Sequence, residues 1–153
     1  MQPNSVKHGT FEIERRYAAA PARVFAAWAH AEQKRRWFAC DESWPVRDHS
    51  FDFRAGGHER LRTGPAGGAV HFFDAQYRDI VRDERIVYTY DMYVAERRIS
   101  VSLASVVLSP AGGGTRMLFT EHVALLDELT TLEEREEGTR IGLDNLGTYL
   151  TLG

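Results

Sequence analysis

Between Cys40 and Ser109 the sequence repeats one pattern, in which apolar and polar residues alternate over short runs that are separated by turns. In one run, the side that is mostly apolar is formed by His71, Phe73, Ala75 and Tyr77. Alternation with a period of two is typical of strands that bury one face. A similar run over Gly9–Tyr17 precedes this region, and a Gly-rich hairpin at Gly112–Gly114 closes it. The pattern predicts six or seven strands in antiparallel succession.

Two short helices are expected between the first strand and the rest of the sheet. Pro21 suits the first turn of a helix, where its missing N–H would be unpaired in any case. Val24, Phe25 and Trp28 follow at helical spacing. A second short helix over Ala31–Phe38 ends in two aromatic residues, and we expect its Lys34–Arg36 cluster to be a solvated face.

The C-terminal part of the chain changes to a helical period. Its acidic start, Glu133–Glu137, favours the positive end of a helix dipole. The predicted apolar stripe consists of Ile141, Leu143, Leu146 and Leu150. The glycines of this helix are Gly138, Gly142 and Gly147. Each glycine costs about 1 kcal/mol relative to alanine, which is acceptable where a helix passes close to other backbone or borders a space.

This order of elements predicts an α+β fold, in which a curved antiparallel sheet wraps around a long C-terminal helix. One helix cannot fill a wide curved sheet, so we expect a hydrophobic cavity between them, with a tightly packed core as the alternative. The side chains expected to line the cavity are Trp37, Phe38, Phe53, Phe73, Tyr77, Tyr88, Tyr90, Met92, Met117, Phe119, Leu143 and Leu146. For Trp37 and Phe38, a purely structural role that fastens the second helix to the sheet is equally open.

Composition limits the class of protein. The length of 153 residues fits one domain, 1–153. A net charge of −3 does not suggest a nucleic-acid surface. The sequence has no apolar run long enough to span a membrane and no apolar segment typical of a signal peptide, so we expect a cytoplasmic protein.

Two carboxylates are the candidates for catalysis, because Glu59 and Glu121 fall on inward faces of their strands. Desolvation raises the pKa of a buried carboxyl group, which can then act as a general acid or base. The alternatives are a structural ion pair, for example with Arg54 or Arg15, or exposure at the end of a strand.

No metal or cofactor site is expected. The histidines form no helical metal pair, and although His49 and His71 could converge, their spacing does not require it. Cys40 has no neighbouring cysteine and no nucleophile motif, so we expect a buried structural thiol. The Gly-rich loops precede strands instead of helices and do not form a phosphate-binding motif.

Six motifs in order resemble the START-like, or SRPBCC, superfamily of helix-grip domains. They are ERRYAAAPARVFAAW, AEQKRRWF, DFRAGG, DIVRDERIVYTY, GGGTRMLFTE and EEGTRIGLDNLGTYL. Within the superfamily, the chain is similar to the branch of activator of heat-shock protein 90 ATPase homologues. Two positions differ from many members: Thr139 follows Gly138 in place of tryptophan, which would enlarge or reshape the cavity, and Arg82 stands where a proline is common.

The resemblance and the inward aromatic face together favour a binding domain for a small hydrophobic or aromatic ligand. An enzyme resembling the cyclases or hydrolases of the superfamily, with a carboxylate in the cavity, is the first alternative. A co-chaperone-like interaction with a heat-shock protein 90 homologue is the second. Outward-facing Val101 and Leu103 would leave an apolar strip on the sheet, which is consistent with a homodimer.

Overall fold

The computed structural model describes residues 5–39 and 41–152, so the thiol expected at Cys40 lies outside the described residues. The elements in chain order are β1 (Lys7–Tyr17), α1 (Pro21–Ala29), α2 (Ala31–Arg35), β2 (Asp48–Phe51), β3 (His58–Thr63), β4 (His71–Val81), β5 (Arg85–Val94), β6 (Arg97–Ala111), β7 (Gly114–Leu125) and α3 (Leu132–Leu150). The order of elements agrees with the order predicted from the sequence.

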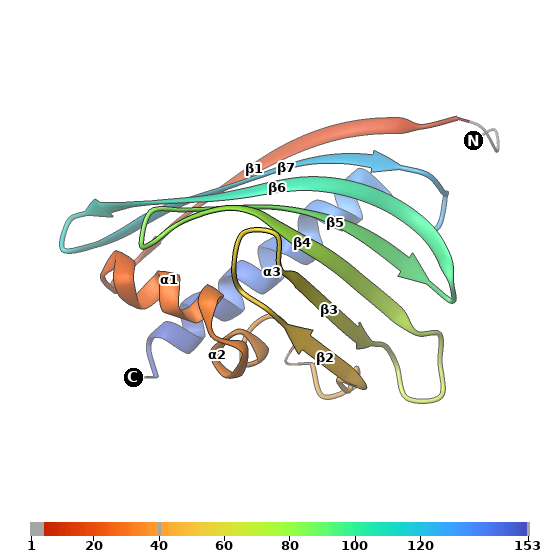
Figure 1. Cartoon of the computed structure of the whole chain (residues 1–153), viewed down its shortest axis with the longest axis horizontal. Coiled ribbons are helices and arrows are strands. Elements are labelled where there is room, and N and C mark those ends of the chain that lie inside the picture. The colour runs from red at the N-terminus through yellow and green to blue at the C-terminus, as the bar shows by residue number, and fades with distance from the viewer. Residues whose placement is uncertain (1–4, 40, 153) are drawn as a thin grey trace.

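The strands form one antiparallel sheet of seven strands in the order β1-β7-β6-β5-β4-β3-β2. β1 is therefore at the edge next to the last strand, and the remaining strands follow as a meander of hairpins. The sheet curves, and α3 crosses its concave side while α1 and α2 cover one end (Figure 1). The predicted helix-grip fold is confirmed.

Helix α3 begins where its sequence provides a cap. The Thr131 hydroxyl accepts a hydrogen bond from the Glu134 backbone N–H, and acidic residues occupy the first turn. Leu143 and Leu146 are buried against the sheet, but Ile141 is 53% exposed, so its predicted place in the apolar stripe is wrong. At 100° per residue, Ile141 lies about 200° around the helix from Leu143.

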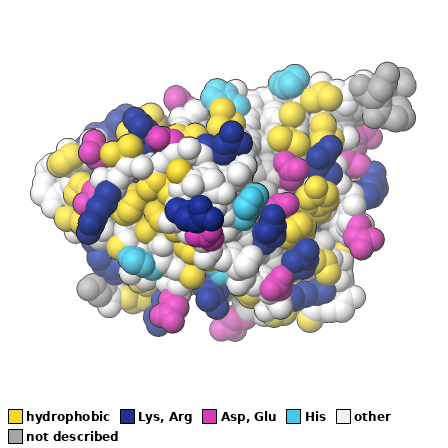
Figure 2. Space-filling view, viewed as in Figure 1, with side chains coloured by type: hydrophobic (Ala, Val, Ile, Leu, Met, Phe, Trp, Pro, Cys, Tyr) yellow, Lys and Arg dark blue, Asp and Glu magenta, His cyan; other side chains and the backbone are white. Residues whose placement is uncertain are grey.

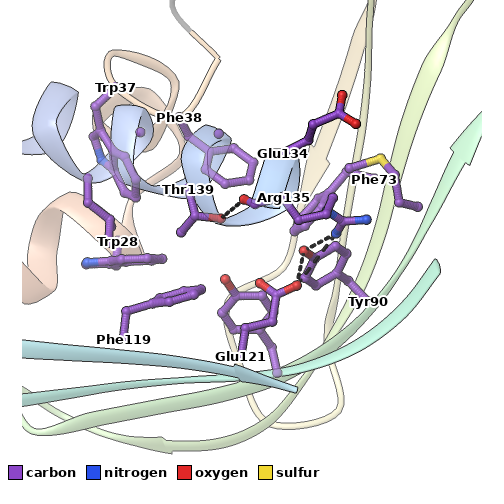
Figure 3. A pocket seen from close by; sticks show the side chains of 15 residues that line it. Trp28, Trp37, Phe38, Phe73, Tyr90, Phe119, Glu121, Glu134, Arg135 and Thr139 are labelled. Carbon is purple, nitrogen blue, oxygen red and sulfur yellow. Dashed lines mark hydrogen bonds and ion pairs between the residues drawn. The ribbon is translucent and has the colours of Figure 1, made fainter. Parts of the chain in front are cut away.

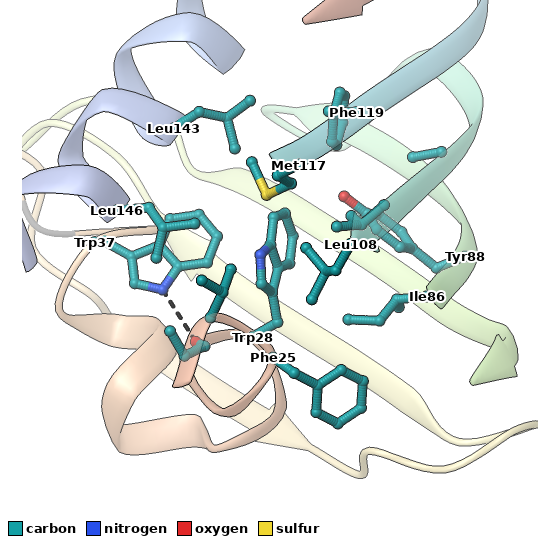
Figure 4. Packing of buried hydrophobic residues seen from close by; sticks show 14 of the residues in the cluster. Phe25, Trp28, Trp37, Ile86, Tyr88, Leu108, Met117, Phe119, Leu143 and Leu146 are labelled. Atoms are coloured by element: carbon teal, nitrogen blue, oxygen red, sulfur yellow. Dashed lines mark hydrogen bonds between the residues drawn. The ribbon is translucent and has the colours of Figure 1, made fainter. Parts of the chain in front are cut away.

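The core lies between the sheet and the three helices. Pro21 occupies the first turn of α1, as predicted, and this helix buries Val24, Phe25 and Trp28. The indole Nε1 of Trp37 donates a hydrogen bond to the Ala27 carbonyl oxygen (3.0 Å), and the Trp37 ring meets Trp28 edge to face (Figure 4). These contacts fasten the turn after α2 to α1, and the considered contact with the sheet is made by Phe38, whose ring meets Phe73 of β4 edge to face.

Helix α3 is tied to the first strand through Tyr17. The Tyr17 hydroxyl donates a hydrogen bond to the Leu143 carbonyl oxygen (2.8 Å). Gly147 lies over the same ring, and a β-carbon at this position would be 3.2 Å from Tyr17 Cε1. This glycine therefore allows a close approach between helix and sheet.

The outer surface carries both signs of charge without a single dominant patch on the face shown in Figure 2. On β6, Val101 and Leu103 are 37% and 44% exposed. None of the helices among the described residues is long and apolar enough to cross a membrane.

Candidate functional site

A cavity of about 250 Å³ lies between α3 and the concave face of the sheet. Its wall is mostly aromatic, with a polar group at one side (Figure 3). The lining residues are Trp28, Trp37, Phe38, Phe73, Tyr88, Tyr90, Met92, Phe119, Glu121, Glu134, Arg135, Gly138, Thr139, Gly142 and Leu143. The cavity exceeds the roughly 150 Å³ of an engineered cavity that binds benzene, so it has room for a larger ring system.

A second hollow of about 530 Å³ adjoins this cavity on the side of β3 and the loop before β2. The two share Trp37, Phe38, Phe73, Met92, Gly138 and Gly142. We call the first the inner cavity and the second the outer groove. Trp44, His71 and the exposed Ile141 line only the outer groove.

The inner cavity depends on two glycines of α3. A β-carbon built at Gly138 or at Gly142 meets no atom within 4 Å, in contrast to Gly147. Thr139 also lines the cavity, and its hydroxyl donates a hydrogen bond to the Arg135 carbonyl oxygen (3.0 Å). Small residues at these positions leave the space beside the helix open.

The polar group at the side of the cavity centres on Glu121 of β7. Its Oε2 atom accepts hydrogen bonds from the Tyr90 hydroxyl (2.7 Å) and from the Ser102 hydroxyl (2.8 Å). Arg135 of α3 lies 3.6 Å from the same oxygen and donates hydrogen bonds to the Tyr90 hydroxyl and to Ser100 Oγ. The expected ion pair is therefore present at Glu121, but its partner is Arg135 and not Arg15 or Arg54.

Burial dominates the proton affinities in this cluster. Desolvation raises the pKa of Glu121 above its ordinary value, although Arg135 and the hydrogen bonds from Tyr90 and Ser102 act in the opposite direction. Desolvation, followed by the Glu121 charge, also raises the pKa of Tyr90. Both tyrosine hydroxyls in the cavity, Tyr88 and Tyr90, therefore remain protonated at neutral pH.

Glu59 belongs to a different cluster, behind the aromatic wall. Its Oε1 atom accepts hydrogen bonds from Lys34 Nζ (2.6 Å) and the Tyr77 hydroxyl (2.7 Å), and Oε2 accepts one from His49 Nε2 (2.9 Å). Lys34 is only 1% exposed, so the prediction of a solvated position is wrong for this residue, while Arg35 and Arg36 are exposed. Lys34 precedes Trp37 and Phe38 by three and four residues and shares their inward side.

Aromatic rings surround the Lys34 ammonium group. The nearest is Phe38, whose ring centroid is 4.4 Å from Nζ, and Trp28 follows at 5.5 Å. Phe73 and Tyr88 lie at 5.8 Å each. Desolvation by itself would raise the pKa of Glu59, but the Lys34 charge and the three hydrogen bonds lower it to about 2. This cluster is an ionised, fully buried pair, and its carboxylate is not among the residues that line the inner cavity or the outer groove.

Eight of the twelve residues expected at the cavity line it: Trp37, Phe38, Phe73, Tyr88, Tyr90, Met92, Phe119 and Leu143. The other four are not among the lining residues. Phe53 packs against Phe25 and Tyr77, and Tyr77 turns to Glu59. Met117 and Leu146 are fully buried in the core. The expectation of cavity contact is therefore wrong for these four. At one end of the sheet, α1 and the buried part of α3 cover the inward-facing side chains, so no cavity remains beside them.

Four residues around the cavity were not predicted: Trp28, Glu134 and Arg135, which line it, and Ser102, which holds Glu121. The sequence did carry a signal for one of them. Arg135, Gly138, Thr139, Gly142 and Leu143 follow the helical spacing i, i+3, i+4, i+7, i+8 and form one stripe that lines the cavity. The Nε1 atom of Trp28 is buried and has no hydrogen-bond partner among the described residues, an exception to the usual satisfaction of buried polar groups.

The histidines do not converge. His49 Nε2 is held by Glu59, whereas His71 packs against Trp44 in the outer groove (ring centroids 4.4 Å apart). Within residues 5–39 and 41–152, no group of three or more His, Cys, Asp or Glu side chains is arranged to hold a metal ion.

A curved sheet that grips a long C-terminal helix, with a cavity between them, defines the START-like class of domains. The family described as "Activator of Hsp90 ATPase homolog 1-like protein" matches residues 18–151, and the chain belongs to this family. Among curated proteins, none matches the sequence.

Solved structures agree with this assignment. An uncharacterised protein from Rhizobium leguminosarum is 46% identical, with 97% of this chain and 98% of that one covered and a TM-score of 0.93. The Mll3558 protein from Rhizobium loti is 43% identical over 95% and 99% of the two chains, with a TM-score of 0.89. Protein CV1439 from Chromobacterium violaceum shares the fold at 21% identity, with 94% and 98% covered and a TM-score of 0.80.

Proposed function

We propose that the protein binds a small hydrophobic or aromatic molecule in the inner cavity. The observation that supports this most directly is the open space beside Gly138 and Gly142, opposite an aromatic wall. A helix that served only for packing would gain stability from side chains at these positions. Ligand sites are typically concave, mostly apolar, and carry few polar groups, as this cavity does.

Native mass spectrometry of the protein purified from its source cells tests the proposal. We expect a co-purifying small molecule that is released by organic solvent. Gly142→Phe fills the cavity and should abolish this mass difference. Glu137→Phe is the matched control, because Glu137 is exposed on the same helix and does not line the cavity. The proposal would be refuted if both variants retained the co-purifying molecule equally. It would also be refuted if the wild type carried no such molecule and bound no apolar probe.

An enzyme remains the second candidate, and of Glu59 and Glu121 the geometry supports Glu121 better. Of the two carboxylates considered, this one lines the cavity, and its pKa is raised by burial. Glu59 is held ionised by Lys34, so it is a poor acid or base. Turnover of a bound ligand that is lost in Glu121→Gln, with binding retained, would favour this candidate.

A co-chaperone-like interaction is supported by the family to which the chain belongs. It is tested by affinity capture with a purified heat-shock protein 90 homologue, and absence of enrichment counts against it.

A homodimer is supported by exposed Val101 and Leu103 on β6. Light scattering should then show a dimer that Leu103→Glu dissociates, and a monomeric wild type would refute it.

A further inference from the structure

On the sheet side of the inner cavity, two polar atoms have no hydrogen-bond partner among the residues that the structure describes. Glu121 receives its hydrogen bonds at Oε2, and Oε1 accepts none from any residue that the structure describes. The Tyr88 hydroxyl likewise has no hydrogen-bond partner among the described residues. Tyr88 projects from β5 with its hydroxyl toward Met117 and Phe119 (Figure 4). The cavity therefore offers one free acceptor and one free hydroxyl.

The sheet places these two side chains on either side of a small residue. Tyr88 pairs with Ala104, and Ala104 pairs with Glu121, so the three form one row across β5, β6 and β7. The row spans two strand spacings of about 4.8 Å each. Because Ala104 adds only a methyl group between them, space remains for a polar atom of a ligand. Burial, followed by the nearby Tyr90 and Glu121 side chains, raises the pKa of Tyr88, so its hydroxyl stays a donor.

Charged groups of both signs lie around the cavity, since Glu121 and Glu134 line it together with Arg135. A cationic ligand near Glu121 would be repelled by Arg135, whose guanidinium lies 3.6 Å from the Glu121 carboxylate. It would also be repelled by the Lys34 ammonium group behind the Phe38 ring. An anionic ligand would meet the Glu121 carboxylate. Arg135 offsets this repulsion only in part, because Glu134 adds a second carboxylate to the lining of the cavity.

From this geometry we infer the chemical class of the ligand: a neutral aromatic molecule with a hydroxyl group. The hydroxyl donates to Glu121 Oε1 and accepts from the Tyr88 hydroxyl, and the rings lie against the aromatic wall. The inference rests on the proposed function, since it assumes that the inner cavity binds a ligand.

Calorimetry with matched probes tests the inference. The probes are 2-naphthol, naphthalene, 2-naphthoate and 2-naphthylmethylammonium, each titrated into the full chain. We expect 2-naphthol to bind about fivefold to tenfold more tightly than naphthalene, as one or two hydrogen bonds provide, and both ions to bind more weakly than naphthalene. Tyr88→Phe and Glu121→Gln should each remove most of the preference for 2-naphthol while naphthalene still binds.

The two variants act through different atoms. In Glu121→Gln, the amide oxygen occupies the Oε2 position, where it accepts the hydrogen bonds from Tyr90 and Ser102. The NH₂ group then occupies the Oε1 position, so a donor replaces the acceptor that the ligand would use. Tyr93→Phe is the control: it removes a tyrosine hydroxyl from the same strand, where the ring stacks on Phe72 away from the cavity. It should retain the full preference.

The outcomes separate the inference from the proposed function. Equal affinity for naphthalene and 2-naphthol in the wild type overturns the inference and leaves hydrophobic binding in place. Tightest binding of 2-naphthoate also overturns it, as does a preference for 2-naphthol that persists in both cavity variants. Failure of every probe to bind overturns the inference together with the proposed function.

Discussion

Replacing Gly138 or Gly142 by alanine should stabilise the unliganded protein. Alanine is favoured over glycine in a helix by about 0.5–1 kcal/mol, and the added methyl group meets no atom within 4 Å at either position. At Gly147 the same change brings Cβ to 3.2 Å from Tyr17 Cε1. The Tyr17 ring is held by its hydrogen bond to Leu143, so it cannot move away freely. Gly147→Ala should therefore lose the helix-propensity gain or destabilise the protein.

Urea denaturation at 25 °C and thermal unfolding measure the three variants against the wild type. An increase of about 1 kcal/mol corresponds to roughly 2–4 °C in Tm for a domain of this size. The helix-propensity term is common to all three changes, so differences among them report the space beside the helix. A Gly142→Ala variant as unstable as Gly147→Ala would refute the argument, since it would mean that α3 already lies in contact with the sheet there.

Three other changes test the buried contacts. Lys34→Met should destabilise the protein by about 3–5 kcal/mol in urea denaturation, because the Glu59 carboxylate loses its buried cation. Adding Glu59→Gln should restore much of this stability. No recovery in the double variant would contradict the buried ion pair between Lys34 and Glu59. The lowered pKa of Glu59 predicts stability that is complete above its ordinary value of 4.5 and is lost as pH falls through about 2. The stability gained from the lowered pKa of Glu59 is about 3 kcal/mol at most. If Glu59→Gln lost stability with falling pH in the same way as the wild type, this contribution of Glu59 would be ruled out. Tyr17→Phe should cost about 1 kcal/mol by removing the hydrogen bond to the α3 backbone, and an unchanged unfolding midpoint would show that this bond contributes nothing.

The fold could be predicted because its signals are local and repeated. The alternating runs and their short turns indicate consecutive antiparallel strands, and the change to a helical period identifies α3. The resemblance to the START-like superfamily then indicated how these elements are arranged. Neither signal gave the distance between helix and sheet, which depends on how side chains from both pack.

The candidate site could be predicted in part. Strand alternation placed Tyr88, Tyr90 and Phe119 on the inner face, and all three line the cavity. It could not distinguish them from Phe53 and Met117, which face the same side but are covered by other elements. Alternation gives the face of the sheet on which a residue lies, whereas cavity lining depends on its distance from the helix.

Charged residues were the hardest to place, because composition alone suggests that they are solvated. Lys34 stands in a basic run, yet it pairs with a strand residue that is 25 positions away. Arg135 stands in an acidic run, yet it contacts Tyr90 across the cavity. Both partners are distant in sequence, and only the three-dimensional arrangement brings each pair together.

The two halves of α3 are held by different kinds of interaction. Its C-terminal half buries Leu143 and Leu146 and is fastened by Tyr17. Its N-terminal half crosses the cavity and reaches the sheet through Leu132, which packs beside Gly9 of β1, and through the Arg135 hydrogen bonds, which water can replace when they break. If the inner cavity binds a ligand as proposed, opening at the N-terminal half has the smaller energetic cost, while the apolar C-terminal half stays in place. The part of this closure that Arg135 provides is electrostatic and should weaken as ionic strength rises.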